Sequence, residues 1–277
     1  MKRITYRSKY LGYLLAAMVT FNSCRKEEKL TASPPQTFYV LPQGNAPADA
    51  IIVDFHQKYG SYILYKFNQS DYAYNYVSKH EDSAFNANPE YIDTALNFFM
   101  NQLVVHYPDA FLKKTLPFKI LLASYIGSGA SRSATGFATT RSALTIGWAD
   151  STILGKTAAQ AKAMRALLHR YYWERAIRTR SVEIPPAFAA LAPSYSTITN
   201  TNRYAEGVVA PAGGIYLEAD FLGYIELITG KTTAELESTL FLPATDKKGL
   251  IRMKYDAVQE YFLTEYNLDL KAIGQLP

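Results

Sequence analysis

AMRALLHRYYWERAI, residues 163–177, lies within the longest helical pattern of the chain, which runs from Thr157 to Arg178. Apolar side chains recur here every three or four residues, the spacing that places them on one face of a helix. The stretch contains a single histidine, His169. We expect this helix to pack into the core of a domain, and the neighbours of His169 then decide which chemistry it supports.

The segments on either side of this helix predict an α+β domain, with strands early and helices late. Before it, residue patterns predict a helix at 49–60, a strand at 61–67, a helix at 89–106 that Pro108 ends, a buried strand at 118–126 and a strand pair at 136–140 and 143–148. After it, they predict a short helical segment at 187–191 and helices at 217–229, 233–238 and 250–265. The polar, tyrosine-rich stretch before 89–106 reads as a loop. We expect an early mixed sheet followed by helices.

The first 24 residues are organised as an export signal. Four basic side chains precede the apolar run 11–21, which is too short to span a bilayer as a helix. Cys24, the only cysteine, follows this run, where a lipoprotein signal peptidase would cleave and a diacylglycerol would be attached. The alternative is an ordinary signal peptide with a coincidental cysteine. Residues 25–29 (RKEEK) resemble the short signal that sends some lipoproteins to the outer face of the outer membrane, so we expect anchoring there, with the periplasmic face as the alternative.

Charge and composition define the remaining parts of the chain. The signal holds four of the 29 Lys and Arg residues, and the remainder nearly balances the 24 Asp and Glu residues. A near-neutral domain gives no electrostatic footprint for nucleic acid, so we exclude nucleic-acid partners. Residues 31–48 are rich in Pro, Ser, Gln and Thr, as in a spacer, although an ordered arm along the domain is an alternative. We therefore predict a signal peptide at 1–23, a lipid-anchored tether at 24–48 and a single domain at 49–277.

Four segments of the domain together carry a family resemblance. They are 91–126, the glycine-containing strand pair 136–148 (GFATTRSALTIGW), the helix 166–177, and a region from GVVAP at 207–211 through EADF at 218–221 into 251–270. Their order and spacing resemble those of zinc-binding metallopeptidase lipoproteins that are often encoded beside outer-membrane glycan-uptake systems. The resemblance covers most of 49–274 and implies a zincin-like metallopeptidase fold. It supports a function only by analogy.

The helix departs from this family at the residues that carry zinc chemistry. A zinc-peptidase helix needs two histidines at i and i+4 on one face, with a glutamate directly after the first as general base. Matched to 169–173, these positions hold His169, Arg170 and Trp173. Matched four residues earlier, they hold Arg165, Ala166 and His169. Either way one imidazole remains and the general base is missing.

The downstream segment departs in the same way. The two glutamates of the family fall on Ala219 and Gly223, while Asp220 remains. We interpret six positions as vestigial parts of a metal motif: His169, Arg170, Trp173, Ala219, Asp220 and Gly223. Other side chains that could rescue a metal site are Glu218, Glu226, His56, His80 and His106, none of which has paired ligand spacing. We predict no catalytic residue, no metal and no other cofactor.

These observations lead us to expect a surface-exposed lipoprotein with a catalytically degenerate metallopeptidase-like domain, which serves as a binding or accessory component of an outer-membrane uptake system. The alternative is an active zinc-dependent peptidase with a non-standard ligand set around His169. The expected partners are the membrane, through lipid on Cys24, uptake proteins, and a peptide or glycan ligand. The strand 143–148 is the candidate sheet edge for a peptide, and the rings of 72–76 (YAYNY) are candidates for stacking on sugars.

Overall fold

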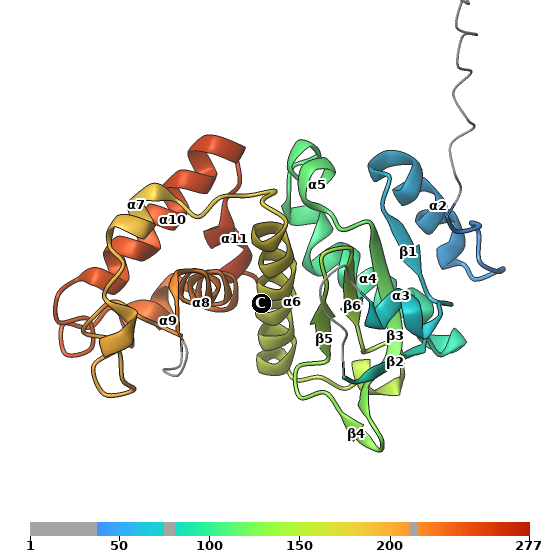
Figure 1. The fold of residues 1–277 in the computed structure, drawn as a ribbon, viewed down its shortest axis with the longest axis horizontal. Coiled ribbons are helices and arrows are strands. Elements are labelled where there is room, and N and C mark those ends of the chain that lie inside the picture. The colour runs from blue at the N-terminus through green and yellow to red at the C-terminus, as the bar shows by residue number, and fades with distance from the viewer. Residues whose placement is uncertain (1–37, 75–80, 211–214) are drawn as a thin grey trace, which may run out of the picture. The chain divides into compact units, whose positions relative to one another are not determined.

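The computed structural model describes residues 38–74, 81–210 and 215–277, and residues 40–277 form one compact unit (Figure 1). The predicted signal peptide, Cys24 and His80 lie outside the described residues. Among the helices that are described, none has the length and apolar character that a membrane span requires. The unit is the single α+β domain expected from the sequence.

A mixed six-stranded sheet forms one part of the domain. Its strands are β1 (Tyr62–Leu64), β2 (Ser83–Asn86), β3 (Lys119–Ser128), β4 (Ser131–Arg132), β5 (Phe137–Thr139) and β6 (Ala143–Ile146). The main path runs β1-β3-β6-β5, in which β1 and β6 lie parallel to β3 and β5 lies antiparallel to β6. The strands β2 and β4 pair antiparallel with β3. The long, buried β3 is therefore the strand around which the sheet is built.

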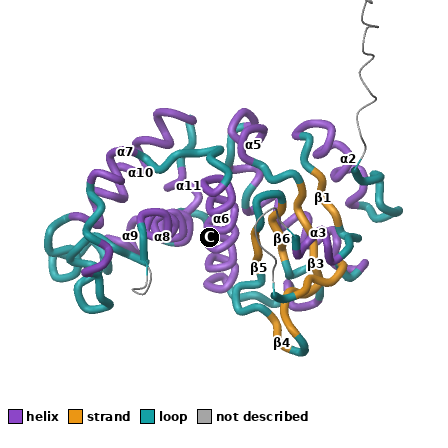
Figure 2. Tube along the Cα trace, in the orientation of Figure 1, coloured by secondary structure: helices purple, strands orange, loops and turns teal. Residues whose placement is uncertain are grey.

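The described helices are α2 (Ala48–Tyr59), α3 (Gln69–Ala73), α4 (Ile92–Gln102), α5 (Asp109–Thr115), α6 (Ala158–Arg178), α7 (Pro186–Ala190), α8 (Leu217–Gly230), α9 (Thr233–Glu237), α10 (Leu250–Tyr266) and α11 (Leu270–Gly274). Helices α2–α5 lie beside the strands, and helices α6–α11 lie together to one side of the sheet (Figures 1 and 2). The helix α6 lies between the sheet and helices α7–α11, with β5 and β6 on one side and α8 on the other. It begins where Thr157 and Gln160 form a capping box.

The predicted helix at 89–106 is wrong as one continuous element. The structure has a 3-10 turn at Pro89–Tyr91, the helix α4, and a second 3-10 turn at Val104–His106. The break falls at Leu103, whose φ of −131° and ψ of −63° are not helical. Leu103 and Val104 are nevertheless buried, so their apolar side chains extend the helical pattern past the end of the helix.

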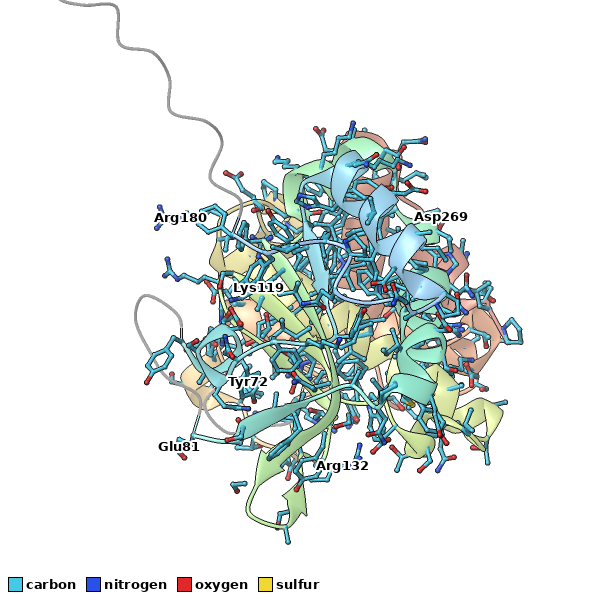
Figure 3. All side chains as sticks on the ribbon, turned by 90° about the vertical axis from the view of Figure 1, so that its right-hand side faces the viewer. Tyr72, Glu81, Lys119, Arg132, Arg180 and Asp269 are labelled. Carbon is cyan, nitrogen blue, oxygen red and sulfur yellow. The ribbon has the colours of Figure 1, made fainter. Side chains whose placement is uncertain are left out.

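Two further expectations are corrected at the sheet. The strand predicted at 143–148 is not an edge, because β6 lies between β3 and β5. The tyrosine-rich stretch is not wholly loop, since it contains α3 and β2. Lys119 of β3, which is labelled in Figure 3, forms an ion pair of 3.0 Å with Asp71 of α3, and this pair holds that helix against the sheet. Tyr72 is 1% exposed and donates a hydrogen bond to Asp82, so it offers no face to a sugar ring.

Residues at the end of the predicted tether lie along the domain. The Gln43 side chain donates to the carbonyl oxygen of Lys66 at 2.6 Å and accepts from the backbone N–H of Tyr65 at 2.8 Å. Leu41 and Ala46 pack against the core. The compact unit therefore begins before the first residue of α2.

Candidate functional site

One face of α6 carries His169 into the core. His169 is fully buried, and both of its ring nitrogens are engaged. Its Nδ1 lies 2.6 Å from the hydroxyl of Tyr107, and its Nε2 lies 2.9 Å from the carbonyl oxygen of Gln102. The indole N–H of Trp173 donates to the same Tyr107 hydroxyl at 2.8 Å. His169 and Trp173, one turn apart, therefore share a partner within a hydrogen-bonded core network.

These contacts fix the protonation of the imidazole. A carbonyl oxygen can only accept, so the His169 Nε2 carries the proton and donates to Gln102. The Nδ1 then accepts from the Tyr107 O–H, whose oxygen accepts in turn from Trp173. Burial lowers the pKa of His169 to about 3, with smaller contributions from His106 and Arg165 in the same direction. At neutral pH the ring is uncharged.

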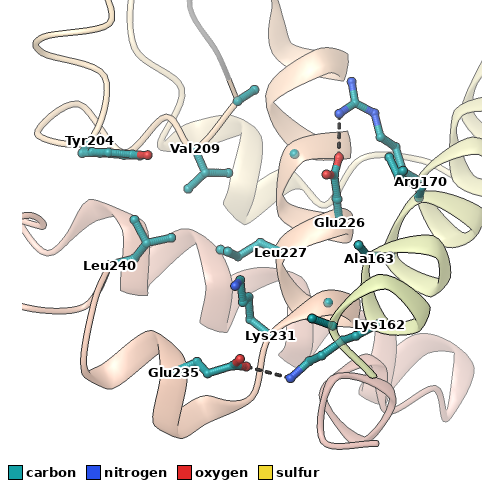
Figure 4. A pocket seen from close by; sticks show the side chains of 16 residues that line it. Lys162, Ala163, Arg170, Tyr204, Val209, Glu226, Leu227, Lys231, Glu235 and Leu240 are labelled. Atoms are coloured by element: carbon teal, nitrogen blue, oxygen red, sulfur yellow. Dashed lines mark hydrogen bonds and ion pairs between the residues drawn. The ribbon is translucent and has the colours of Figure 1, made fainter. Parts of the chain in front are cut away.

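A neighbouring face of α6 borders a pocket of about 500 Å³ against α8 and α9 (Figure 4). Small and apolar side chains make up most of its wall, and two ion pairs cross it. The lining residues are Ala159, Lys162, Ala163, Ala166, Leu167, Arg170, Tyr204, Val209, Ala210, Gly223, Glu226, Leu227, Gly230, Lys231, Glu235 and Leu240. Within this lining, α6 and α8 meet through residues that lack bulk, such as Ala166 and Gly230. A Cβ added at Gly230 would lie only 2.6 Å from the Cβ of Ala166.

The pocket brings together two of the six predicted motif positions. Arg170 and Gly223 line it, and the Arg170 guanidinium donates to the Glu226 carboxylate at 2.6 Å. Both charged side chains are about one-third exposed. Ala219 is half-buried and does not line the pocket. A metal motif needs two ligands one turn apart on the same helix face. On α6, the residues with this spacing that face α8 are Ala166 and Arg170, and His169 is not one of them.

Asp220 has a separate structural role. Its carboxylate accepts from the Lys254 ammonium of α10 at 2.7 Å and from the Tyr195 hydroxyl at 2.9 Å. Lys254 also donates to the carbonyl oxygen of Gly207 at 3.0 Å, and both charged side chains are fully buried. Burial raises the pKa of Asp220 and lowers that of Lys254, whereas their mutual attraction acts in the opposite direction on each. The pair ties α8 and α10 to the loop that precedes α8.

The described residues do not fit a zinc ion. No group of three His, Cys, Asp or Glu side chains that could hold a metal occurs in the described part of the chain. A histidine that ligates zinc must offer a free nitrogen lone pair, and both ring nitrogens of His169 are already hydrogen-bonded. His106 lies against the carbonyl oxygen of Asn101 at 2.9 Å, and His56 stacks on Tyr62 with ring centroids 4.0 Å apart.

The carboxylates near α6 also fail to provide zinc ligands, because they form ion pairs or lie outside the pocket lining. Glu226 is paired with Arg170, a permanently charged cation that would repel a metal ion. Glu218 is exposed and lies outside the pocket lining. Glu174, which follows His169 on α6 but is not among the candidates, forms an ion pair of 2.5 Å with Arg178 on the same helix. None of these carboxylates converges with His169.

Comparison with known proteins gives one informative match. No family model matches the sequence, and no curated protein matches it. A crystal structure from Bacteroides caccae, described as a "putative zinc-binding metallo-peptidase", is similar to 81% of this chain and 87% of its own, with a TM-score of 0.56 and 15% sequence identity. At this identity the likeness establishes the fold. The chain therefore has an α+β fold similar to that of a metallopeptidase-like protein.

Sequence reasoning did not anticipate the pocket residues Lys162, Lys231 and Glu235. The available signal was the spacing of small residues. On α6, Ala159, Ala163 and Ala166 follow one another at three or four residues, and on α8 Gly223 and Gly230 are two turns apart. Such stripes let helices approach closely, although the sequence does not say which two helices meet.

Proposed function

We propose that this chain is a surface-exposed lipoprotein whose metallopeptidase-like domain has lost zinc chemistry. It acts as a non-catalytic binding or accessory component of an outer-membrane uptake system. The observation that carries this proposal is the bonding of His169, the one histidine of the metal-helix stretch. To ligate zinc, its fully buried ring would have to give up a hydrogen bond to Tyr107 or Gln102.

The face of α6 that borders the pocket supports the same proposal. It presents Ala166, Leu167 and Arg170 toward α8, so it offers neither an imidazole nor a general base. Loss of the base removes orders of magnitude in rate, and loss of the ligands removes the Lewis acid. An active peptidase with a non-standard ligand set around His169 finds no supporting contact among the described residues.

The anchoring and the location rest on the sequence. The basic and apolar segments before Cys24 support export and lipidation, and the RKEEK stretch at 25–29 supports display on the outer face of the outer membrane. The proposed partners are the membrane, through lipid on Cys24, and neighbouring uptake proteins. Replacing Cys24 with serine is expected to abolish incorporation of labelled fatty acid and to release the protein from the membrane fraction.

Metal content tests the loss of zinc chemistry. Residues 30–277 are purified without chelator, incubated with zinc, dialysed and measured by mass spectrometry, beside His169→Ala and the matched variant His106→Ala. We expect no stoichiometric zinc in any of the three. About one zinc per chain that disappears in His169→Ala and persists in His106→Ala would overturn the proposal and restore the peptidase alternative.

A further inference from the structure

One of the cationic side chains that line the pocket between α6 and α8 has no ion-pair partner among the carboxylates of the lining. Arg170 pairs with Glu226 at 2.6 Å, and Lys162 pairs with Glu235 at 2.8 Å. Each carboxylate that lines the pocket is therefore neutralised by a pocket cation. The third cation is Lys231, for which the described part of the chain supplies no ion pair.

Lys231 lines the pocket beside apolar side chains and is exposed to solvent. It follows Gly230, the last residue of α8, and its side chain extends between the two ion pairs beside Leu227 and Leu240 (Figure 4). Val209 adds a further apolar side chain to the lining. The arrangement is one positive charge at the edge of an apolar space.

We propose that this pocket binds a small amphipathic carboxylate, with the carboxylate on Lys231 and the apolar body against Leu227, Leu240 and Val209. This inference deepens the proposed non-catalytic binding role and rests on it. Ligand pockets of a few hundred Å³ are mostly apolar, with a few polar groups that fix the ligand's orientation. A charge-assisted hydrogen bond to an ammonium group is the interaction that offsets desolvation of a carboxylate.

The charged side chains of the pocket favour a ligand that carries a single negative charge. A cationic ligand would meet Lys231 and would have to displace Arg170 or Lys162 to reach a carboxylate. A dianion would bring a second charge for which the pocket lining has no unpaired cation. A neutral ligand of the same shape fills the apolar space but gains no ion pair with the Lys231 ammonium. The monocarboxylate alone satisfies both the charge and the apolar wall.

Calorimetric titration of the full domain with octanoate, octan-1-ol and octylamine tests this proposal. We expect octanoate to bind with one site per chain and at least about tenfold more tightly than octan-1-ol or octylamine, a difference of about 1.4 kcal/mol. Lys231→Met should remove the preference for octanoate over octan-1-ol. The control Lys247→Met makes the same change of charge outside the pocket lining and should leave the preference intact.

A second variant locates the ligand. Ala163→Leu adds bulk to the pocket without changing its charge and should weaken octanoate and octan-1-ol alike. The proposal is wrong if octanoate shows no saturable binding, if Lys231→Met keeps the preference, or if Ala163→Leu leaves both ligands unaffected. Zinc analysis of the same samples separates the two proposals, because zinc-free protein that ignores octanoate refutes only the ligand, whereas stoichiometric zinc refutes the loss of zinc chemistry.

Discussion

Acidification should destabilise this protein through His169, and the size of the effect follows from its surroundings. The folded chain holds the ring neutral with a pKa of about 3, whereas the unfolded chain exposes it with an ordinary pKa of about 6.5. The unfolded state therefore binds the proton first as the pH falls. The free energy of unfolding decreases from about pH 6.5 downward at about 1.4 kcal/mol per pH unit, and this loss ends near pH 3. Between pH 7 and pH 5 it amounts to about 2 kcal/mol.

The assay is urea unfolding at pH 7, 6 and 5, followed by tryptophan fluorescence, to which the fully buried Trp173 contributes together with Trp148. His169→Gln cannot titrate, so its stability should fall by about 2 kcal/mol less than that of the wild type over this interval. The carboxylates are common to both proteins and cancel in the comparison. Equal slopes for the wild type and His169→Gln would refute the assignment of a buried, neutral imidazole.

His106→Gln is the matched control for this experiment. The pKa of His106 is also lowered, and burial is the main cause. However, this side chain is only partly buried. It contributes to the acid slope in the same direction as His169 and by a smaller amount. The His106→Gln protein should therefore keep most of the wild-type slope. If it instead loses as much of the slope as His169→Gln, the acid sensitivity does not belong to the core network.

Three further predictions concern the packing around α6 and α8. Asp220→Asn or Lys254→Met should each lower the free energy of unfolding by about 3–5 kcal/mol because one charge stays buried alone, and Asp220→Leu with Lys254→Met should recover much of it in urea unfolding. Gly230→Ala should cost about 1–3 kcal/mol through overpacking against Ala166, with a favourable coupling energy to Ala166→Gly in a double-mutant cycle. Arg170→Met should change the free energy of unfolding by less than about 1 kcal/mol, because its ion pair with Glu226 is partly exposed. A larger loss would show that this ion pair stabilises the packing of α6 against α8.

The sequence predicted correctly those helices whose apolar pattern stops at the same residues as their capping signals. The helix α2 ends at Gly60, which adopts the left-handed conformation with φ of 71°, and α6 starts at the Thr157 capping box, so both limits were readable. The helix 89–106 failed for the opposite reason. Its apolar pattern continues beyond Leu103, while the backbone there leaves the helix. Side-chain periodicity reports burial, and burial persists across a break.

The edge of the sheet could not be read from local sequence. The strands β5 and β6 are adjacent in the chain and antiparallel, so either could have been the outer one. The parallel pairing of β6 with β3 decides the order, and it joins residues that are 24 positions apart in the chain, such as Lys119 and Ala143. Such non-local pairing leaves no mark on the composition of the strand.

The orientation of α6 explains why the site was only partly predictable. Aligning the metal motif on His169 assumes that a surviving histidine stays on the functional face. In the structure, His169 and Trp173 point to Tyr107, and Ala166 and Arg170 point to α8. Helical spacing assigns residues to a common face but does not say what that face meets.

The bonding of His169 supplies a physical reason for its presence that requires no metal. Removing the ring would leave the Gln102 carbonyl and the Tyr107 hydroxyl short of a partner, at a cost of about 1–3 kcal/mol for each buried polar group. Binding a metal at His169 would incur the same kind of loss, because the ligating nitrogen must first release its partner. The hydrogen bonds through which His169 stabilises the core are thus the same ones that oppose its use as a metal ligand. A histidine in a metal-helix position is informative about zinc only when at least one of its nitrogens is free.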